Sequence, residues 1–217
     1  MVSSDPLVAG KSALKRGDYS IAFRAFTPLA NEGNAEAQTH LGILYEKGLG
    51  VLEDHKIALA WYEKSGKNGD AMGQHNAGIF YFEGRGVEKN YPAAYEWFLK
   101  ATDSDYPPSE YMLGLMYHQG YGVAVNFERA RLWFLKAAKQ GDANAQFMYA
   151  YMVQSGEGEK SDPPTAMVWA LVSGKNGKSD SVAITVPSSI TMTKLEISTA
   201  EKIANECYQS NYQNCPE

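Results

Sequence analysis

Apolar and polar residues alternate along most of this chain with the spacing of amphipathic helices. In residues 110–142, EYMLGLMYHQGYGVAVNFERARLWFLKAAKQGD, two such patterns flank a turn that is rich in glycine. Apolar residues that recur every three to four positions predict one buried face on each helix. We therefore expect this stretch to form two helices folded back on each other.

The same pattern recurs at intervals of 36 residues. Glycine occupies one register position of the first helix at Gly42, Gly78 and Gly114. The second helix keeps two register positions through four copies, which are Ala58, Ala94, Ala130, Ala166 and Trp61, Trp97, Trp133, Trp169. An internal period of about 20–50 residues is typical of a solenoid. The sequence thus predicts an all-α solenoid of helix–turn–helix repeats.

The repeats define one predicted solenoid domain, 1–217. Its expected parts are an N-terminal helix pair at 5–34, repeats at 35–70, 71–106 and 107–142, a degenerate fourth repeat at 143–178, and a C-terminal capping helix at 191–215. Residues 181–189 lose helical periodicity, so VAITVP is compatible with an extended segment. Thr193 and Glu196 have the spacing of a capping box, which predicts the start of the last helix.

Glycine inside a helix needs a reason, because it costs roughly 1 kcal/mol relative to alanine. We interpret Gly42, Gly78 and Gly114 as points of close contact, where the tryptophan or alanine of the second helix approaches the first. The glycines of the turns, in contrast, are expected to supply backbone angles that a Cβ atom would penalise.

Composition narrows the classes of partner. The formal net charge of −5 and a pI near 5.5 argue against nucleic acid, which favours a basic protein surface. No segment approaches the roughly 18 consecutive apolar residues of a membrane span. The first residues, MVSSDPLVAG, have neither the basic nor the apolar region of a signal peptide. The chain is therefore expected to be cytoplasmic or to lack its leader here.

The run A-x-A-Q-x-x-L-G-x-x-Y-x-x-G-x-G-V-x-x-D-x-x-x-A-x-x-W-x-x-K begins at Ala35 and ends at Lys64. It closely resembles the Sel-one-like repeat, a relative of the tetratricopeptide repeat that is common in bacteria. The match is good over 35–142, weak over 143–178, and limited to helical pattern at both ends. The resemblance implies a right-handed α-α superhelix that acts as an adaptor for a protein or peptide. Some cysteine-rich relatives are associated with β-lactam binding, but this chain has no cysteine in its repeats.

The resemblance also implies where a partner binds. In this class the first helix of each repeat lines the concave face, and residues spaced 3, 4, 3 point into the groove. The groove residues implied are Glu36, Thr39, Ile43, Glu46, Met72, His75, Ile79, Phe82, Tyr111, Leu115, His118, Asn144, Phe147, Tyr151 and Gln154. Many are apolar or aromatic, as expected of an interaction surface. The alternative is that several of them simply pack against neighbouring helices.

The two cysteines, Cys207 and Cys215, lie near the end of the last helix. A continuous helix would hold them roughly 12 Å apart, whereas a disulfide needs Cα atoms about 4.4–6.8 Å apart. If Asn211 takes the left-handed conformation and ends the helix, the pair can close. We predict this disulfide, which favours a periplasmic or secreted protein made with a leader. The alternative is two free thiols in a cytoplasmic protein.

The other motifs in the sequence predict no phosphate-binding, metal or catalytic site. The G-x-G turns lack the strand and the G-K-[ST] of a phosphate loop, and the four histidines lack the spacing of metal ligands, so no metal or cofactor is expected. No catalytic motif is recognised. We therefore expect a non-enzymatic adaptor, monomeric and not inserted in a membrane. Two alternatives stay open, a hydrolase by analogy with the β-lactam-binding relatives and a structural unit that assembles end to end.

Overall fold

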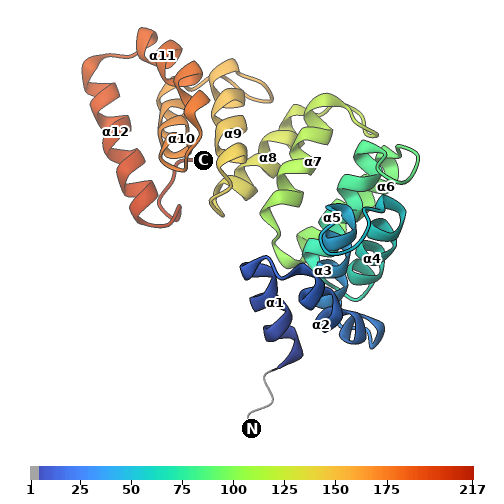
Figure 1. Ribbon diagram of the computed structural model, residues 1–217. Coiled ribbons are helices and arrows are strands. Elements are labelled where there is room, and N and C mark those ends of the chain that lie inside the picture. Colours follow the sequence, from blue (N-terminus) through green and yellow to red (C-terminus); the bar gives the residue numbers. More distant parts are fainter. Residues whose placement is uncertain (1–4) are drawn as a thin grey trace. The chain divides into compact units, whose positions relative to one another are not determined.

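The computed structural model describes residues 5–217, and all regular structure in this range is helical (Figure 1). The chain divides into two compact units, with the boundary between Ser104 and Asp105. Each unit is built from consecutive helices that pack in pairs. This arrangement confirms the prediction of an all-α fold made of repeated helix pairs.

The first unit contains three helix pairs. Its helices are α1 (Pro6–Arg16), α2 (Tyr19–Asn31), α3 (Ala35–Glu46), α4 (His55–Lys67), α5 (Ala71–Glu83) and α6 (Tyr91–Ala101), followed by the short 3₁₀ helix η1 (Thr102–Ser104). Within each pair the two helices pack together, and α2 then packs on α3 and α4 on α5. Each pair thus buries its apolar face against its neighbours, as expected of a solenoid.

The second unit contains the third and fourth repeats and the C-terminal helices. Its helices are α7 (Pro107–Gln119), α8 (Phe127–Ala138), α9 (Ala143–Ser155), α10 (Pro163–Lys175), the short 3₁₀ helix η2 (Ser179–Ser181), α11 (Val182–Thr191) and α12 (Lys194–Gln209). Helix α10 is central, because it packs against α9, α11 and α12. Its Trp169 side chain is fully buried.

The second helix of every repeat starts where the sequence predicts. The side chains of Asp54, Asn90, Asn126 and Asp162 each accept a hydrogen bond from the backbone N–H three residues further on. This bond satisfies one of the N–H groups that a helix start leaves unpaired. The side chain at this position thus fixes where the turn ends and the helix begins.

Close contact at the glycines inside the first helices is confirmed, but with a different partner. A Cβ atom on Gly42 would lie 2.4 Å from the ring of Tyr62. On Gly78 it would lie 2.6 Å from the Phe98 ring, and on Gly114 it would lie 2.6 Å from the Phe134 ring. The expectation of tryptophan or alanine at this contact was wrong. The aromatic residue that follows each tryptophan turns fully into the helix pair, whereas Trp61 and Trp133 remain half-buried.

The segment after the fourth repeat also differs from the expectation. Residues 182–191, which include VAITVP, form helix α11 although Pro187 lies inside it. Ile184 and Ser188, four positions apart, are both buried, and Ser188 Oγ donates 2.9 Å to the Ile184 carbonyl and 2.5 Å to Gln154 Oε1. Burial of this one face holds the segment helical against a sequence that shows little periodicity.

The last helix starts at the predicted capping box and ends before residue 215, where the predicted range ends. Thr193 caps α12, and its side chain and that of Glu196 bond each other's backbone N–H groups in the predicted capping box. The helix continues to Gln209. Thr191, which we expected to open this helix, instead closes α11.

We expect Gly114→Ala to lower the free energy of unfolding by roughly 1–3 kcal/mol, because the new methyl group overlaps the Phe134 ring in a packed core. Helix propensity alone would predict a gain of about 1 kcal/mol. Urea unfolding followed by circular dichroism measures the difference.

The matched control is Ala150→Gly, at the same register position of the fourth repeat. The residue 20 positions further on is Ala170 there instead of an aromatic, and both alanines are fully buried. This change should cost only about 1 kcal/mol, the propensity difference. A Gly114→Ala variant as stable as the parent would contradict the assigned contact.

Candidate functional site

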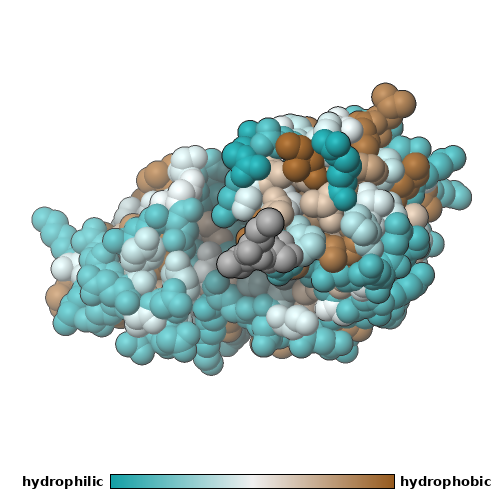
Figure 2. Space-filling view, turned by 60° about the horizontal axis from the view of Figure 1, so that its bottom comes forward, coloured by the Kyte–Doolittle hydropathy of each residue, from teal (hydrophilic) through white to brown (hydrophobic). Residues whose placement is uncertain are grey.

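The candidate site is the surface of the first helices of the repeats, which we call the A-face. In the first unit it comprises α3 and α5, and in the second α7 and α9. Figure 2 shows one side of the molecule as a whole, on which hydrophobic side chains lie in small separate groups among hydrophilic ones. Scattered apolar groups of this kind are ordinary on a protein surface. The site must therefore be judged from individual side chains.

A pocket of about 160 Å³ opens on the A-face of the first unit. It is lined by Glu36, Thr39 and His40 of α3, by Met72 of α5, and by Asp70, which caps α5. Three of these five, Glu36, Thr39 and Met72, are groove residues predicted from the sequence. The structure thus brings residues of consecutive repeats together at this point. Met72 is 40% exposed and is one of the large hydrophobic residues of the chain that reach solvent.

Thr39 lines this pocket. We expected it to contact a partner, but its side chain is not available for that. It is only 2% exposed. Its hydroxyl donates 2.6 Å to Asp70 Oδ2 and lies 2.7 Å from Ser65 Oγ. Ser65 in turn bonds the Ala35 carbonyl at 2.7 Å. These hydrogen bonds join α3, α4 and the start of α5, so Thr39 serves the contact between two repeats.

Other predicted groove residues of the first unit pack partly inward. The His75 ring lies 5.5 Å from that of Phe98, and the Phe82 ring lies 5.1 Å from that of Tyr91. Ile43 packs against the buried cluster around Tyr62, and Ile79 is half-buried. Burial lowers the pKa of His75 to about 4. These side chains combine a packing role with partial exposure.

Glu46 of the predicted groove is paired within the first unit. Its carboxylate accepts hydrogen bonds from Tyr62 Oη and, at 2.5 Å, from Arg85 Nη1. Arg85 also lies over the Phe80 ring, 4.6 Å from its centroid. Burial and the Glu46 carboxylate both raise the pKa of Tyr62. This network joins the turn of the second repeat to the end of α3.

The A-face of the second unit carries an aromatic cluster around His118. The His118 ring lies 6.5 Å from that of Tyr151 and 5.4 Å from that of Phe127. Its Nε2 is 2.7 Å from Glu157 Oε2, in the turn of the fourth repeat. Tyr111 packs on Phe134 at 5.7 Å. Two predicted residues, His118 and Tyr151, are thus neighbours here, and Tyr151 is 42% exposed.

The other predicted residues of this face differ in their exposure and contacts. Phe147 is half-buried beneath the Lys178 ammonium, which sits 5.6 Å from the ring centroid. Leu115 is half-buried and Asn144 is exposed. The Gln154 side chain accepts the hydrogen bond from Ser188 and so supports α11.

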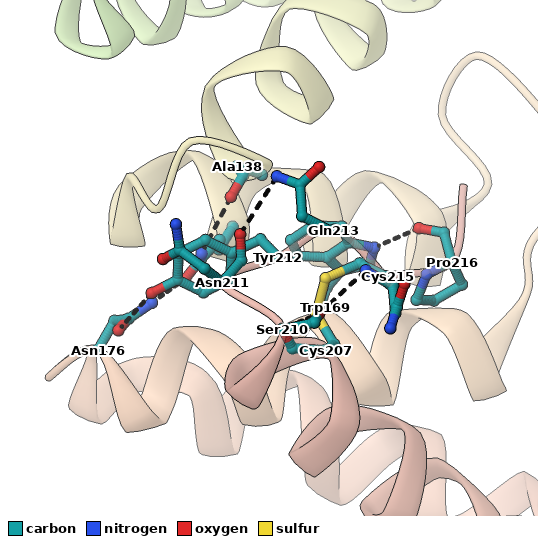
Figure 3. Close-up of a disulfide and its surroundings, with 12 residues drawn as sticks. Ala138, Trp169, Asn176, Cys207, Ser210, Asn211, Tyr212, Gln213, Cys215 and Pro216 are labelled. Atoms are coloured by element: carbon teal, nitrogen blue, oxygen red, sulfur yellow. Dashed lines mark hydrogen bonds between the residues drawn. A yellow bond between two sulfur atoms is a disulfide. The ribbon is translucent and has the colours of Figure 1, made fainter.

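The C-terminal segment is joined to the second unit by a disulfide between Cys207 and Cys215 (Figure 3). Their Cα atoms are 4.7 Å apart. Asn211 takes a φ of 52° just after the end of α12, which is the left-handed conformation that closure requires. Two further bonds hold the segment on α10, from Tyr212 Oη to Asn176 Oδ1 at 3.0 Å and from Trp169 Nε1 to the Pro216 carbonyl at 2.8 Å.

Sequence reasoning missed two members of the pocket, His40 and Asp70. Asp70 was recognised only as the end of a repeat, and His40 only as a histidine without a metal-binding partner. The available signal was the position of Asp70 at the start of α5, which places it beside α3 of the preceding repeat. Among residues 5–217, no group of three or more His, Cys, Asp or Glu side chains forms a metal-binding cluster.

Comparison with known proteins explains this architecture. The family description "Sel1 repeat" matches four consecutive segments, residues 35–70, 71–106, 107–142 and 143–177. The chain belongs to the Sel1 repeat family. This is the Sel-one-like repeat that the sequence pattern resembles. Proteins of this family are in general protein-interaction adaptors, and their fold is typically a non-catalytic scaffold.

Solved structures agree with this assignment. A Sel1 repeat protein from Oxalobacter formigenes is 27% identical, with a TM-score of 0.78 over 92% of this chain and 84% of that one. The protein c5321, a protective antigen of uropathogenic Escherichia coli strains, is 29% identical, with a TM-score of 0.85 over 95% of this chain and 45% of its own. A search of curated proteins found no match. No helix in the described part of this Sel1 repeat chain is long and apolar enough to cross a membrane.

We expect the stability of this Sel1 repeat protein to fall as the pH drops from about 6.5 to about 4. In this window the unfolded His75 binds a proton, whereas the folded, buried ring with a pKa of about 4 does not. The unfolded state then binds more protons, so acid lowers the free energy of unfolding, by a total on the order of 3 kcal/mol. Comparing urea unfolding of the parent and His75→Leu at several pH values isolates this contribution. Parallel pH profiles would show that His75 does not cause it.

We expect reduction of the Cys207–Cys215 disulfide to lower the free energy of unfolding by about 2–3 kcal/mol, because the bond restricts a short loop in the unfolded chain. Thermal unfolding with and without reductant measures the loss. Because Trp169 bonds the Pro216 carbonyl, its fluorescence should change on reduction of the folded protein. The Cys207→Ala/Cys215→Ala variant is the control, since reductant should leave its fluorescence and stability unchanged.

Proposed function

We propose that this Sel1 repeat protein is a non-enzymatic adaptor that binds a peptide or protein partner through its A-faces. The observation that carries the proposal is the aromatic cluster of the second unit. There Tyr151, 42% exposed, lies beside His118 at a ring distance of 6.5 Å, with Tyr111 on the same helix as His118. Tyrosines that are held by packing and still reach solvent are frequent anchors of binding energy.

The surroundings of these rings support binding by preorganisation. Glu157 fixes the His118 ring through its Nε2, and Phe134 supports Tyr111 from beneath. A tyrosine has only two side-chain torsions, so little conformational entropy is lost when a partner packs against it. In the first unit, Met72 adds an exposed and adaptable apolar contact.

We also propose that the protein acts as a monomer in an oxidising compartment, either the periplasm or the cell exterior. The Cys207–Cys215 disulfide supports this location, because cytoplasmic thiols are kept reduced. The intact mass of protein isolated from its native cell, with and without reductant before alkylation, tests the location. Light scattering over a range of concentrations tests the monomer.

We expect Tyr111→Ala/Tyr151→Ala to weaken partner binding at least roughly 30-fold, since loss of an anchor typically costs 2 kcal/mol or more. A random peptide library displayed on phage is selected on the parent protein, and the Kd of each enriched peptide is then measured for parent and variant. The Tyr151→Ala single variant keeps the test valid if loss of Tyr111 disturbs packing.

The matched control is Tyr208→Ala on α12, which removes a tyrosine of similar exposure, 41%, away from the A-face. It should leave peptide binding unchanged. Peptides that bind the folded double variant as tightly as the parent would place the binding site elsewhere on the molecule.

A further inference from the structure

The pocket on the A-face of the first unit has a chemical character of its own. Its volume is about 160 Å³, and it combines two carboxylates, Glu36 and Asp70, with the imidazole of His40 and the thioether of Met72. The size suits the end of one side chain better than a whole small molecule, since typical ligand pockets hold roughly 300–1,000 Å³.

Asp70 has one carboxylate oxygen committed to the fold and one that is not. Its Oδ2 accepts hydrogen bonds from Thr39 Oγ1 at 2.6 Å, from the Gly73 N–H at 2.8 Å and from Ser65 Oγ at 3.3 Å. Among the described residues, no hydrogen bond to Oδ1 is found. The carboxylate is therefore held in place with one oxygen left to accept a bond from a ligand.

His40 lines the same pocket without satisfying its ring nitrogens. Both Nδ1 and Nε2 are buried and have no hydrogen-bond partner within residues 5–217. The ring stacks on Phe26 at 4.6 Å, and Nε2 lies 3.7 Å from Glu36 Oε1, which is too long for a hydrogen bond. Burial lowers the pKa of His40, so the neutral ring keeps one nitrogen as an acceptor. Buried polar atoms without partners are rare and call for an explanation.

An ammonium group of the chain itself already contacts one of the carboxylates that line this pocket. Lys11 Nζ of α1 lies 2.7 Å from Glu36 Oε1. Both side chains are nearly half exposed, at 47% and 44%. Exposed ion pairs of this kind contribute little to stability. Lys11 therefore shows that Glu36 accepts an ammonium group, and this weak pair can be replaced by a competing one.

We propose that this pocket binds the ammonium group of a lysine side chain supplied by the protein or peptide partner, which displaces Lys11. The three N–H groups of the ammonium match three acceptors, which are the Glu36 carboxylate, Asp70 Oδ1 and one His40 nitrogen. Met72 packs along the aliphatic part of the lysine. This inference rests on the proposed adaptor function and names one chemical group that the partner must carry.

The corresponding positions of the third and fourth repeats lack this chemistry. A shift of 72 residues turns Glu36, Thr39, His40 and Met72 into Pro108, Tyr111, Met112 and Asn144, and only the aspartate is kept, as Asp142. No ammonium site is expected there, so the second unit provides an internal control.

The probe for the test is n-butylammonium, which reproduces the end of a lysine side chain. It is titrated into the full-length protein while NMR follows the Met72 methyl group and the His40 ring. We expect saturable shifts of both signals, no such response to n-butanol, and no shift of the Met112 methyl group. Glu36→Gln should weaken binding roughly 10-fold or more, as expected for loss of a hydrogen bond between charged groups. Lys11→Met should strengthen it several-fold, because the internal competitor is removed.

Asp70→Asn adds a second variant, since asparagine keeps the helix cap while removing the charge. Circular dichroism verifies that each variant is folded. Absence of saturable shifts in the parent, equal affinity in Glu36→Gln, or weaker binding in Lys11→Met would each overturn the proposal.

One further comparison tells whether the ammonium group comes from a lysine side chain or from a free amine. A second tells failure of the pocket apart from failure of the proposed peptide site. Blocked lysine, Nα-acetyl-lysine methylamide, should bind at least as tightly as cadaverine. Cadaverine binding about 10-fold tighter would assign the pocket to free amines and overturn a role in partner recognition. The Tyr111→Ala/Tyr151→Ala variant should bind n-butylammonium normally, so failure of the proposed peptide site and failure of the pocket give different results.

Discussion

The structure depends on the contact of a glycine in one helix with an aromatic ring in the next. Gly42, Gly78 and Gly114 each meet a fully buried ring at a distance that leaves no room for a Cβ atom. The N-terminal pair repeats the arrangement, because a Cβ atom on Gly10 would lie 2.5 Å from Phe26. The ring fills the space that the missing side chain leaves, so the two helices approach closely and keep a fixed register. In the fourth repeat the two corresponding positions are Ala150 and Ala170, and both are fully buried.

A second set of residues joins one helix pair to the next. Gln38, Gln74 and Gln146 donate side-chain hydrogen bonds of 2.9–3.0 Å to the carbonyls of Ala30, Gly66 and Ala138, eight residues earlier. At the corresponding position the third repeat has Glu110, which has no amide to donate and is instead paired with Lys136 and Gln140 within its own unit. Asp105, with a φ of 47°, stands where other repeats have a left-handed glycine. The chain divides into two units at this altered connection.

The sequence predicts the fold almost completely because periodic spacing fixes helix, turn and pairing together. It predicts contacts less well. Tryptophan and the aromatic residue after it show the same period, so the pattern alone does not tell which of them, Trp97 or Phe98, enters the helix pair. The sequence pattern also fails to predict α11, because Pro187 is unfavourable inside a helix and the helix is stabilised by tertiary burial. The same limit applies to the candidate site. Thr39 and Met72 share a predicted groove, but hydrogen bonds to Ser65 and Asp70 bury the first while the second stays exposed.

The repeated frame explains how one fold carries two kinds of A-face. Glycine–ring contacts and cap residues recur between repeats, whereas the residues at positions such as 36, 40 and 72 differ from those at the corresponding positions of the third and fourth repeats. In the first unit they hold an acid, a histidine and a methionine around a small pocket. In the second unit the equivalent surface is apolar and aromatic around Tyr111, His118 and Tyr151. Under the two proposals, the face of the first unit selects a cationic side chain and that of the second unit selects apolar groups, and a requirement for both features is more selective than either alone.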